Sequence, residues 1–279
     1  MIPLAELLRF IAEDSPRGDL TTDTLAPLGR CRARIFLREP GVAAGVEEAA
    51  TLFSHFGVKV LRAVPDGMRV EADAPLMNLE GDAAPVLLVE RSALNLIARM
   101  SGIATMTRAL VETARRVNPS VRVAATRKTA PGLRLLDKKA VVLGGGDPHR
   151  ATLSDRILIK DNHLALIPLT EAIQRARARM AGTAIEVEVT TLTDALTAAE
   201  QGADMIMLDN MDPWTIRTVL ATLRERGLRE RVGIEISGGI TPENIAGYAA
   251  LGADVISIGR LTHSVRSLDV SLEVSPAPE

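Results

Sequence analysis

The sequence predicts an α/β fold, because short β-branched segments alternate with helical segments over the second half of the chain. The segments typical of strands are 121–126, 156–160, 185–189, 205–210, 232–237 and 255–260. Helical patterns fill most of the intervals between them, at 167–180, 192–201, 213–226 and 241–251. Strands that are joined through helices run parallel, so we expect one parallel sheet, either open or closed into a barrel.

An internal repeat supports this arrangement. Gly202-Ala203-Asp204 followed by Ile206 recurs as Gly252-Ala253-Asp254 followed by Ile256, 50 residues later. That spacing corresponds to about two strand–helix units of a barrel. In both copies we expect the glycine to end a helix and the apolar residues to begin a strand.

The first half of the chain is less regular. We expect an amphipathic helix at 4–13, a turn at 18–22, strands near 32–38, 58–64 and 68–70, and a helical tract at 85–117 interrupted at 101–102. This pattern predicts an N-terminal α+β domain over residues 1–104. An α/β barrel domain over residues 105–279 follows it, and its C-terminal tail can return to the first domain.

Composition excludes several classes of protein. The 279 residues are 47% hydrophobic, which is enough for a packed core, yet no apolar run reaches the length of a membrane span. The N-terminus lacks the basic and apolar stretches of a secretory signal. Cys31 is the single cysteine, so no intramolecular disulfide forms and a cytoplasmic location is expected. We expect Cys31 to be an ordinary core or strand residue.

Charge is unevenly distributed along the chain. The net charge of −2 does not favour nucleic acid. Residues 125–163 nevertheless hold eight Lys/Arg and four acids, a surplus of four positive charges, with no aromatic residue for base stacking. We interpret this segment as a pocket for a small anion. The alternative is a solvated basic face, to which we assign Lys138 and Lys139.

Charged or small residues end the predicted strands. These residues are Lys160, Glu188, Asp209, Ser237 and Gly259. Catalytic groups of barrel enzymes stand at the carboxyl ends of the strands, so we expect these side chains to share one mouth. Two acids at such a mouth suit sugar hydroxyls or a Mg²⁺ ion that bridges to phosphates. A transition-metal site is disfavoured, because no close histidine pair supplies the usual ligand spacing.

The loops after the last two strands are typical of a phosphate site. Ser237-Gly238-Gly239 is followed by Pro242, where we expect a helix to begin, and Gly259 comes one unit later. Paired loops at these positions form the usual phosphate site of barrel enzymes. Tight turns without a ligand are the alternative, and two glycine loops at this interval favour the phosphate.

Arginines in the basic segment indicate a substrate with more than one carboxylate. Arg127 and Lys128 end a strand, and His149-Arg150 follows the Gly144–Gly146 loop, whose small residues can bring backbone close to a ligand. Arginine binds a carboxylate through two parallel hydrogen bonds, so several arginines at one mouth fit a dicarboxylate.

Eleven stretches of the chain resemble the quinolinate phosphoribosyltransferase family, also called nicotinate-nucleotide pyrophosphorylase (carboxylating). Among them are Thr-Arg-Lys-Thr at 126–129, Lys-Asp-Asn-His at 160–163 and Ser-Gly-Gly-Ile at 237–240. The others are 18–22, 90–95, 101–105, 144–146, 149–150, 186–189, 208–211 and 261–264, while 130–134 extends the first motif and 158–159 the second. They follow the family's order over nearly the whole chain.

The resemblance implies a reaction and a fold. The quinolinate ring nitrogen attacks C1 of phosphoribosyl pyrophosphate, giving nicotinate mononucleotide, CO₂ and pyrophosphate with Mg²⁺ and no organic cofactor. The transition state resembles a ribosyl oxocarbenium ion, which fixed charges stabilise. The implied fold is an incomplete α/β barrel behind an N-terminal α+β domain. The implied assembly is a homodimer or a higher homo-oligomer with shared active sites, and neither nucleic acid nor membrane is a partner.

The resemblance also implies which residues act. Those that contact the substrate dicarboxylate are Arg127, His149, Arg150 and Lys160, with Arg91 reaching the site from a neighbouring subunit. Those that face phosphoribosyl pyrophosphate are Lys128, Glu188, Asp209, Ser237, Gly238, Gly239, Gly259 and His263. Glu188 and Asp209 take the ribose hydroxyls and Mg²⁺, the ion either directly or indirectly. The catalytic set is Lys128, Lys160, Glu188 and Asp209.

Four positions depart from the family pattern, at Ala125, Pro148, Thr152 and Thr190. None of them removes an expected ligand. One alternative is the related group encoded with molybdate-transport genes, acting on another acid. Two others are a Schiff-base aldolase that uses Lys160 and a non-catalytic phosphosugar-binding barrel.

Overall fold

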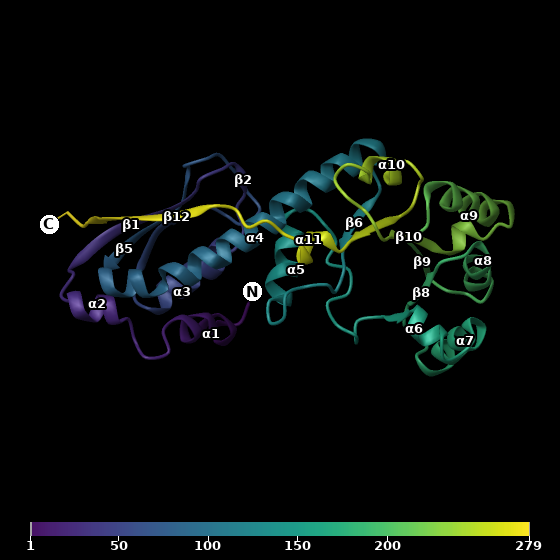
Figure 1. Ribbon diagram of the computed structural model, residues 1–279, viewed down its shortest axis with the longest axis horizontal. Coiled ribbons are helices and arrows are strands. Elements are labelled where there is room, and N and C mark those ends of the chain that lie inside the picture. Colours follow the sequence, from purple (N-terminus) through teal and green to yellow (C-terminus); the bar gives the residue numbers. More distant parts are fainter. Residues whose placement is uncertain (1, 279) are drawn as a thin grey trace. The chain divides into compact units, whose positions relative to one another are not determined.

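The computed structural model describes residues 2–278, which form two compact units (Figure 1). The first unit contains residues 2–108, 130–145 and 264–278, and the second contains residues 109–129 and 146–263. Chain segments therefore alternate between the units, and residues 130–145 pack with the N-terminal part. The single division after residue 104 stays a prediction. Among residues 2–278, no helix combines the length and the apolar character needed to cross a membrane.

An antiparallel sheet with the strand order β12-β1-β5-β3 organises the first unit. Its strands are β1 (Arg30–Leu37), β3 (Lys59–Ala63), β5 (Pro75–Asp82) and β12 (Val270–Pro276), and β2 (Gly41–Val42) pairs separately with β4 (Arg69–Val70). The helices are α1 (Leu4–Asp14), α2 (Leu20–Leu25), α3 (Val46–His55), α4 (Ala83–Val117) and α5 (Arg134–Leu143). The C-terminal strand β12 lies beside β1, drawn in yellow and purple in Figure 1.

Two local predictions for the first unit are wrong. The expected turn at 18–22 is the start of α2, because the Asp19 carboxylate accepts hydrogen bonds from the backbone N–H groups of Thr21 and Thr22. The expected interruption at 101–102 is absent, since α4 is continuous there. The fully buried Ser101 hydroxyl bonds both the N–H and the carbonyl of Ala44, so this small residue serves close packing.

The second unit holds the predicted parallel sheet, with the strand order β6-β11-β10-β9-β8-β7. Its strands are β6 (Arg122–Ala125), β7 (Ile157–Ile159), β8 (Ile185–Val189), β9 (Met205–Asp209), β10 (Gly233–Ser237) and β11 (Val255–Ile258). Its helices are α6 (Asp161–Leu164), α7 (Leu169–Arg179), α8 (Leu192–Glu200), α9 (Pro213–Glu225), α10 (Ile245–Ala249) and α11 (Arg260–His263), with a 3₁₀ turn at Arg229–Arg231. Figure 1 shows α7, α8 and α9 in a row along one side of this sheet.

The sheet of the second unit is an incomplete barrel, as expected. Strands β6 and β7 are its two edges and do not pair with each other. Residues that follow both edges, Arg127 and Lys160, nevertheless line one cavity, so the sheet curls around it. All six carboxyl ends therefore face a common opening.

The internal repeat has a structural explanation at the opposite end of the strands. Asp204 Oδ2 accepts the N–H of Ile185, at 2.7 Å, and Asp254 Oδ2 accepts the N–H of Ile234, also at 2.7 Å. Arginines pair with the same oxygens, Arg177 at 2.9 Å and Arg229 at 3.0 Å. In each copy, the carboxylate satisfies a backbone N–H at the start of the neighbouring strand, the first residue of β8 and the second of β10, so the repeated motif helps fix where a strand begins.

We predict that Asp254→Ala lowers the free energy of unfolding by about 1–3 kcal/mol, because it leaves the N–H of Ile234 without its acceptor. Urea unfolding followed by circular dichroism measures this. Glu225→Ala, at an exposed acid on α9, is the matched control and should change stability by less than about 0.5 kcal/mol. Equal effects of the two substitutions would contradict this role for the repeat.

Candidate active site

A cavity of about 470 Å³ opens at the carboxyl ends of the parallel strands. Ten of the residues predicted from the sequence line it: Arg127, Lys128, His149, Arg150, Lys160, Glu188, Asp209, Ser237, Gly238 and Gly239. The remaining lining residues are Ala125, Thr126, Leu158, Met207, Asn210, Glu235 and Ser257. Four of the five residues that end the predicted strands are among the residues that line it: Lys160, Glu188, Asp209 and Ser237.

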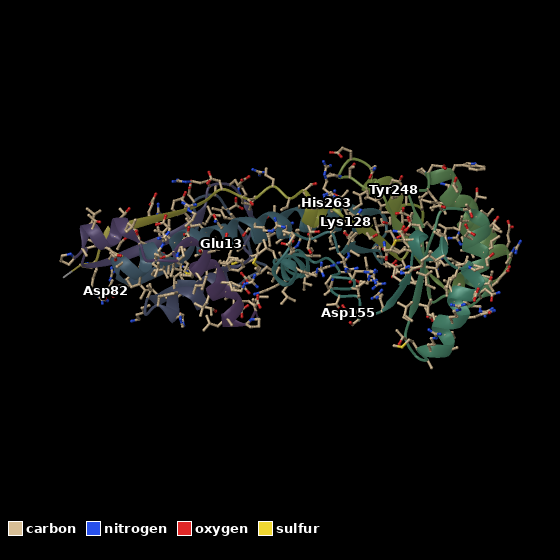
Figure 2. All side chains as sticks on the ribbon, turned by 60° about the horizontal axis from the view of Figure 1, so that its bottom comes forward. Glu13, Asp82, Lys128, Asp155, Tyr248 and His263 are labelled. Carbon is tan, nitrogen blue, oxygen red and sulfur yellow. The ribbon has the colours of Figure 1, made fainter. Side chains whose placement is uncertain are left out.

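Gly259 and His263 lie beside Lys128 at the same end of the sheet, and Figure 2 shows Lys128 and His263 close together. A Cβ atom on Gly259 would lie 3.0 Å from the His263 ring and 3.2 Å from Cδ of Lys128. The hydroxyl of Thr262 donates to the Lys128 carbonyl at 2.8 Å. The loop after β11 therefore fixes the backbone that carries Lys128.

Arg91 lies on α4 in the first unit, with a side chain that is 61% exposed. Its guanidinium is 4.0 Å from the carboxylate of Glu90. The role expected of Arg91 in a neighbouring subunit stays a prediction.

One buried and one half-buried arginine contribute positive charge to the cavity. Arg150 is only 6% exposed, and burial together with the nearby charge of Arg127 lowers its pKa. The Nε atom of Arg127 is buried and has no hydrogen-bond partner among the described residues. Burying a donor of this kind is costly unless a partner binds it, so these arginines indicate an anion site.

Lys160 and Glu188 form an ion pair at the mouth. Lys160 follows β7 and its Nζ donates to Glu188 Oε2 at 2.9 Å, from one strand end to the next. The backbone N–H of Lys160 donates to Nδ1 of His163 at 3.0 Å. The last residue of the Lys-Asp-Asn-His run therefore supports the turn that presents Lys160.

Asp209 is oriented by its neighbour. Nδ2 of Asn210 donates to Asp209 Oδ2 at 2.9 Å, while the Asn210 backbone N–H donates to the Ser237 carbonyl at 2.9 Å. Gly238 has φ of +90°, and a Cβ there would lie 2.2 Å from Asn210 Oδ1. Only glycine fits at this position, so the glycine loop and the Asp209 side chain are packed as one unit.

The helix expected from Pro242 begins later, at Ile245. Asn244 explains the difference, since its Oδ1 accepts the Thr241 N–H at 2.8 Å and its Nδ2 donates to the Gly239 carbonyl at 2.9 Å. These bonds close a loop in place of the first helical turn. The prediction of a helix start at this point, with free N–H groups for an anion, is therefore wrong.

Below the arginines, His149 contacts two buried acids that the sequence reading missed. His149 Nε2 is 3.2 Å from Glu186 Oε2 and 3.3 Å from Glu235 Oε2. Burial lowers the pKa of His149, but the two carboxylates outweigh it and raise the pKa to about 9. Burial raises the pKa of Glu186, an effect that Glu235 reinforces and His149 opposes. The sequence could have indicated both acids. Side chains alternate along a strand, so residue 186 lies on the same face as Glu188, and residue 235 on the same face as Ser237.

Lys138 and Lys139 do not form a solvated face. Lys138 is 5% exposed. Lys139 Nζ is 2.6 Å from carboxylate oxygens of both Glu47 and Glu48 and 3.3 Å from Asp66. Burial lowers the pKa of Lys139, yet the hydrogen bonds that it donates to Glu47 and Glu48, with the charges of Glu48 and Asp66, raise it above its usual value. The prediction for this pair is wrong because its partners lie far away in the sequence.

Gly144 also has a structural role in place of the expected ligand contact. A Cβ there would lie 2.6 Å from the carbonyl oxygen of Ala104 and from Cβ of Thr107. The glycine lets the end of α5 pack closely against α4.

The first unit has its own cavity of about 470 Å³, beside α1 and α4, but Arg99 on its wall is paired bidentately with Asp137. Arg127 and Arg150, the arginines that indicate an anion site, line the cavity of the second unit.

Family models match nearly the whole chain. The model described as Quinolinate phosphoribosyl transferase, N-terminal domain, matches residues 19–101, and that of the C-terminal domain matches residues 103–273. The chain belongs to the quinolinate phosphoribosyl transferase family. The barrel cavity lies within the segment matched by the C-terminal domain of this family.

Relatives in this family agree over their full lengths. A probable nicotinate-nucleotide pyrophosphorylase [carboxylating] of Methanothermobacter thermautotrophicus is 48% identical, covering 95% of this chain and 96% of its own. The nicotinate-nucleotide pyrophosphorylase [carboxylating] of Homo sapiens is 36% identical, covering 100% of this chain and 95% of its own. The crystal structure of the Ehrlichia chaffeensis nicotinate-nucleotide pyrophosphorylase superposes with a TM-score of 0.92 at 33% identity, covering 98% and 99% of the two chains.

The His149 cluster predicts how stability changes with pH. A free histidine has a pKa of about 6.5, and that of His149 in the folded chain is about 9. The stabilisation from imidazolium formation is therefore complete below about pH 6.5 and is lost as the pH rises through 9. The difference in Tm between the wild type and His149→Gln should be largest at pH 6.5 and shrink by pH 9.5. We expect about 2–4 °C for each kcal/mol lost.

Differential scanning fluorimetry over this pH range measures the difference. His55→Gln, at an exposed residue of α3, is the control and should give a Tm difference that does not vary with pH. A constant Tm difference for His149→Gln would show that His149 is neutral in the folded chain.

Proposed function

We propose that the barrel cavity joins quinolinate to the phosphoribosyl group of phosphoribosyl pyrophosphate, releasing pyrophosphate and CO₂ and leaving nicotinate mononucleotide. The observation that carries this proposal is the buried Arg150 next to Arg127, whose buried Nε has no partner among the described residues, in a cavity that also holds the glycine loop. It agrees with the reaction that the names of the family and its relatives describe.

The acid-binding side of the cavity suits a dianion. Arg127 and Arg150 supply planar guanidinium groups that can take carboxylates through paired hydrogen bonds. His149 and Lys160 add two further cationic donors at the same cavity. A bound dicarboxylate would supply the acceptor that the buried Nε of Arg127 lacks. Quinolinate, whose two carboxylates are adjacent on one ring, offers such a charge pattern.

The opposite side of the cavity suits the phosphoribosyl donor. Ser237, Gly238 and Gly239 form a loop in which two successive glycines have positive φ, of +90° and +63°. Successive backbone N–H groups in such loops make anion-binding concavities, so we assign this loop to the 5′-phosphate. We assign the adjacent loop with Gly259, together with Lys128 and His263, to the pyrophosphate.

The reaction requires positioning and fixed charge in place of a catalytic nucleophile. As the bond from C1 to pyrophosphate breaks, positive charge develops on the ribose and negative charge on the leaving group. Carboxylates of Glu188 and Asp209 stabilise the first, and Lys128 stabilises the second. The ring nitrogen then bonds to C1, and its positive charge stabilises the carbanion left on the ring carbon when the adjacent carboxylate departs as CO₂. A proton replaces that carboxylate on the ring.

The acids at the mouth fit a Mg²⁺ ion. Glu188 uses Oε2 for Lys160 and Asp209 uses Oδ2 for Asn210, so each keeps one further oxygen for a hard cation or its water ligands. When bound, Mg²⁺ would neutralise charge on the departing pyrophosphate. We propose this ion as the only cofactor.

Lys160 favours this reaction over an aldolase. A Schiff-base lysine must be desolvated and neutral, whereas the Lys160 side chain is 41% exposed and donates to the Glu188 carboxylate. We therefore assign Lys160 to carboxylate binding as an ammonium group.

The test is an assay with quinolinate, phosphoribosyl pyrophosphate and Mg²⁺, with nicotinate mononucleotide detected by chromatography. We expect product with Mg²⁺, none in excess EDTA, and recovery when Mg²⁺ is restored. Pyrophosphate release without quinolinate-dependent product would favour another acid as substrate. Binding of phosphoribosyl pyrophosphate without any turnover would favour a non-catalytic barrel.

We predict that Arg150→Ala lowers kcat/KM for quinolinate roughly a hundredfold, because truncating a buried ion-pair partner costs about 2–5 kcal/mol. Arg150→Lys should recover only part of this loss, since an ammonium cannot form the paired hydrogen bonds of a guanidinium. Steady-state kinetics measures both variants, with folding checked by thermal melts.

Arg217→Ala, at an exposed arginine on α9, is the control for loss of a positive charge and should leave kcat/KM unchanged within about twofold. Lys139 cannot serve as such a control, because it is paired with three carboxylates. If the Arg150 and Arg217 variants both lost only a small and equal part of kcat/KM, Arg150 would not bind the dicarboxylate.

We further propose a cytoplasmic homodimer, or a larger assembly of dimers, in which Arg91 completes the site of the neighbouring subunit. Support comes from the exposed Arg91 side chain on α4 and from the single cysteine, Cys31, which suits a reducing compartment.

Mixing inactive Arg91→Ala and Arg150→Ala proteins tests the shared site. After subunit exchange, each hybrid dimer should contain one site with both arginines and one with neither, and activity should return in part. Exchange shown by mass spectrometry without any recovered activity would mean that Arg91 acts within its own chain or not at all.

A further inference from the structure

Two buried acids hold the His149 ring from the inner side of the barrel. The side chains of Glu186 and Glu235 are 2% and 0% exposed, and that of His149 is 9% exposed. Both distances to His149 Nε2 are within ion-pair range, at 3.2 and 3.3 Å. Neither Oε2 atom has a well-aligned hydrogen-bond donor among the described residues, so this contact is an ion pair that the two acids share.

The strand pattern brings these acids together under the cavity. Glu186 is on β8, two residues before Glu188, and Glu235 is on β10, two residues before Ser237. Alternation along a strand turns both acids toward the barrel interior, like the site residues after them. Strand β9 lies between β8 and β10, so the curl of the sheet makes the two carboxylates converge.

These two carboxylates need a cation. Burying a carboxylate is costly unless it is paired, and a second one nearby adds repulsion. The cations that face the pair are His149 and Arg156, whose Nη1 is 3.8 Å from Glu186 Oε2. Arg127 and Arg150 are the other charged groups of the cavity close by. The imidazolium form of His149 therefore compensates the acids directly.

The backbone fixes His149 from its other side. Its φ of +53° is unusual for a residue other than glycine, and the Asp147 carboxylate accepts its backbone N–H at 2.7 Å. With the backbone held here and Nε2 held by the acids, the ring has one orientation. The nitrogen that remains for the cavity is Nδ1.

We propose that Glu186 and Glu235 are positioning residues that hold His149 as an imidazolium, with its Nδ1–H presented to a carboxylate of the bound acid. The proposal rests on the proposed function for the identity of that acid. It explains why two acids lie beneath an anion site: they orient and charge a donor that lines the cavity but is itself almost fully buried.

Kinetics of Glu186→Gln and Glu235→Gln test the consequence for binding. Each substitution keeps the shape of the side chain and removes its charge. We expect KM for quinolinate to rise tenfold or more, while KM for phosphoribosyl pyrophosphate changes less than twofold. Glu225→Gln on α9 is the matched control and should change neither value.

A double-mutant cycle separates positioning from general stability. In a His149→Gln background, Glu186→Gln should have little further effect on KM for quinolinate, because the group that it positions is absent. Full additivity of the two effects on KM would overturn the proposal.

A measurement without substrate keeps this test independent of the proposed function. The chain has four histidines, so ¹⁵N-histidine NMR of the ligand-free protein, assigned with His149→Gln, reads the ring directly. At pH 7.5 we expect both His149 nitrogens protonated in the wild type and a neutral ring in the Glu186→Gln/Glu235→Gln protein. Where the double variant does not fold, the single variants are read at the pH where the wild-type ring is half titrated.

Three results would overturn the proposal. One is a neutral His149 in the wild type, and another is an unchanged imidazolium in the variants. The third is stoichiometric Zn²⁺ binding that shifts the His149 signals, since three ligand atoms here could also hold a metal. If quinolinate is not the substrate, only the kinetic arm fails, and the spectrum still decides whether the acids charge the ring.

Discussion

Compensation of buried charge is the constraint on which the barrel site depends. Arg150 is buried in the cavity wall and Arg127 is half-buried beside it, and the charge of Arg127 lowers the pKa of Arg150. Glu186 and Glu235 lie beneath them, and the Glu186 carboxylate favours the charged form of Arg150. A layer of acids below a layer of cations lets the cations stay charged in the absence of substrate, while their outer donors remain available.

The same parallel sheet assigns opposite tasks to its two ends. At the amino ends, the carboxylates of Asp204 and Asp254 each accept a backbone N–H near the start of a neighbouring strand and pair with an arginine, which fixes the start of that strand. At the carboxyl ends, the residues after the strands turn into loops that line the cavity. The stable end sets the strand register, so side chains at the other end arrive at fixed positions, as electrostatic catalysis requires.

The half-buried cations Lys139, Arg99 and Arg127 differ in whether carboxylates of the protein bind their donors. Lys139 contacts three carboxylates, and Arg99 binds Asp137 through both arms of its guanidinium. Such pairs stabilise packing and leave no charge to offer. Arg127 has a buried Nε without a partner, in a cavity where a ligand can reach it. Whether the N–H donors of a cation already have partners in the protein, more than its burial alone, distinguishes a structural cation from one that can bind a ligand.

The sequence by itself determined the strand–helix alternation, the parallel sheet and the residues that end its strands, because these depend on periodicity and on neighbours in the chain. It therefore identified ten of the side chains that line the cavity, and the family motifs gave their roles. Only the tertiary structure decided which charges are buried and paired. Lys139 and Glu48 are 91 residues apart, and Glu186 and Glu235 meet His149 through the curl of the sheet. The close packing of Ser101 against Ala44, and of Gly144 against Ala104 and Thr107, likewise depends on segments that are distant in the sequence. Local patterns report which face a residue occupies, whereas its charge partners are set by the folded chain.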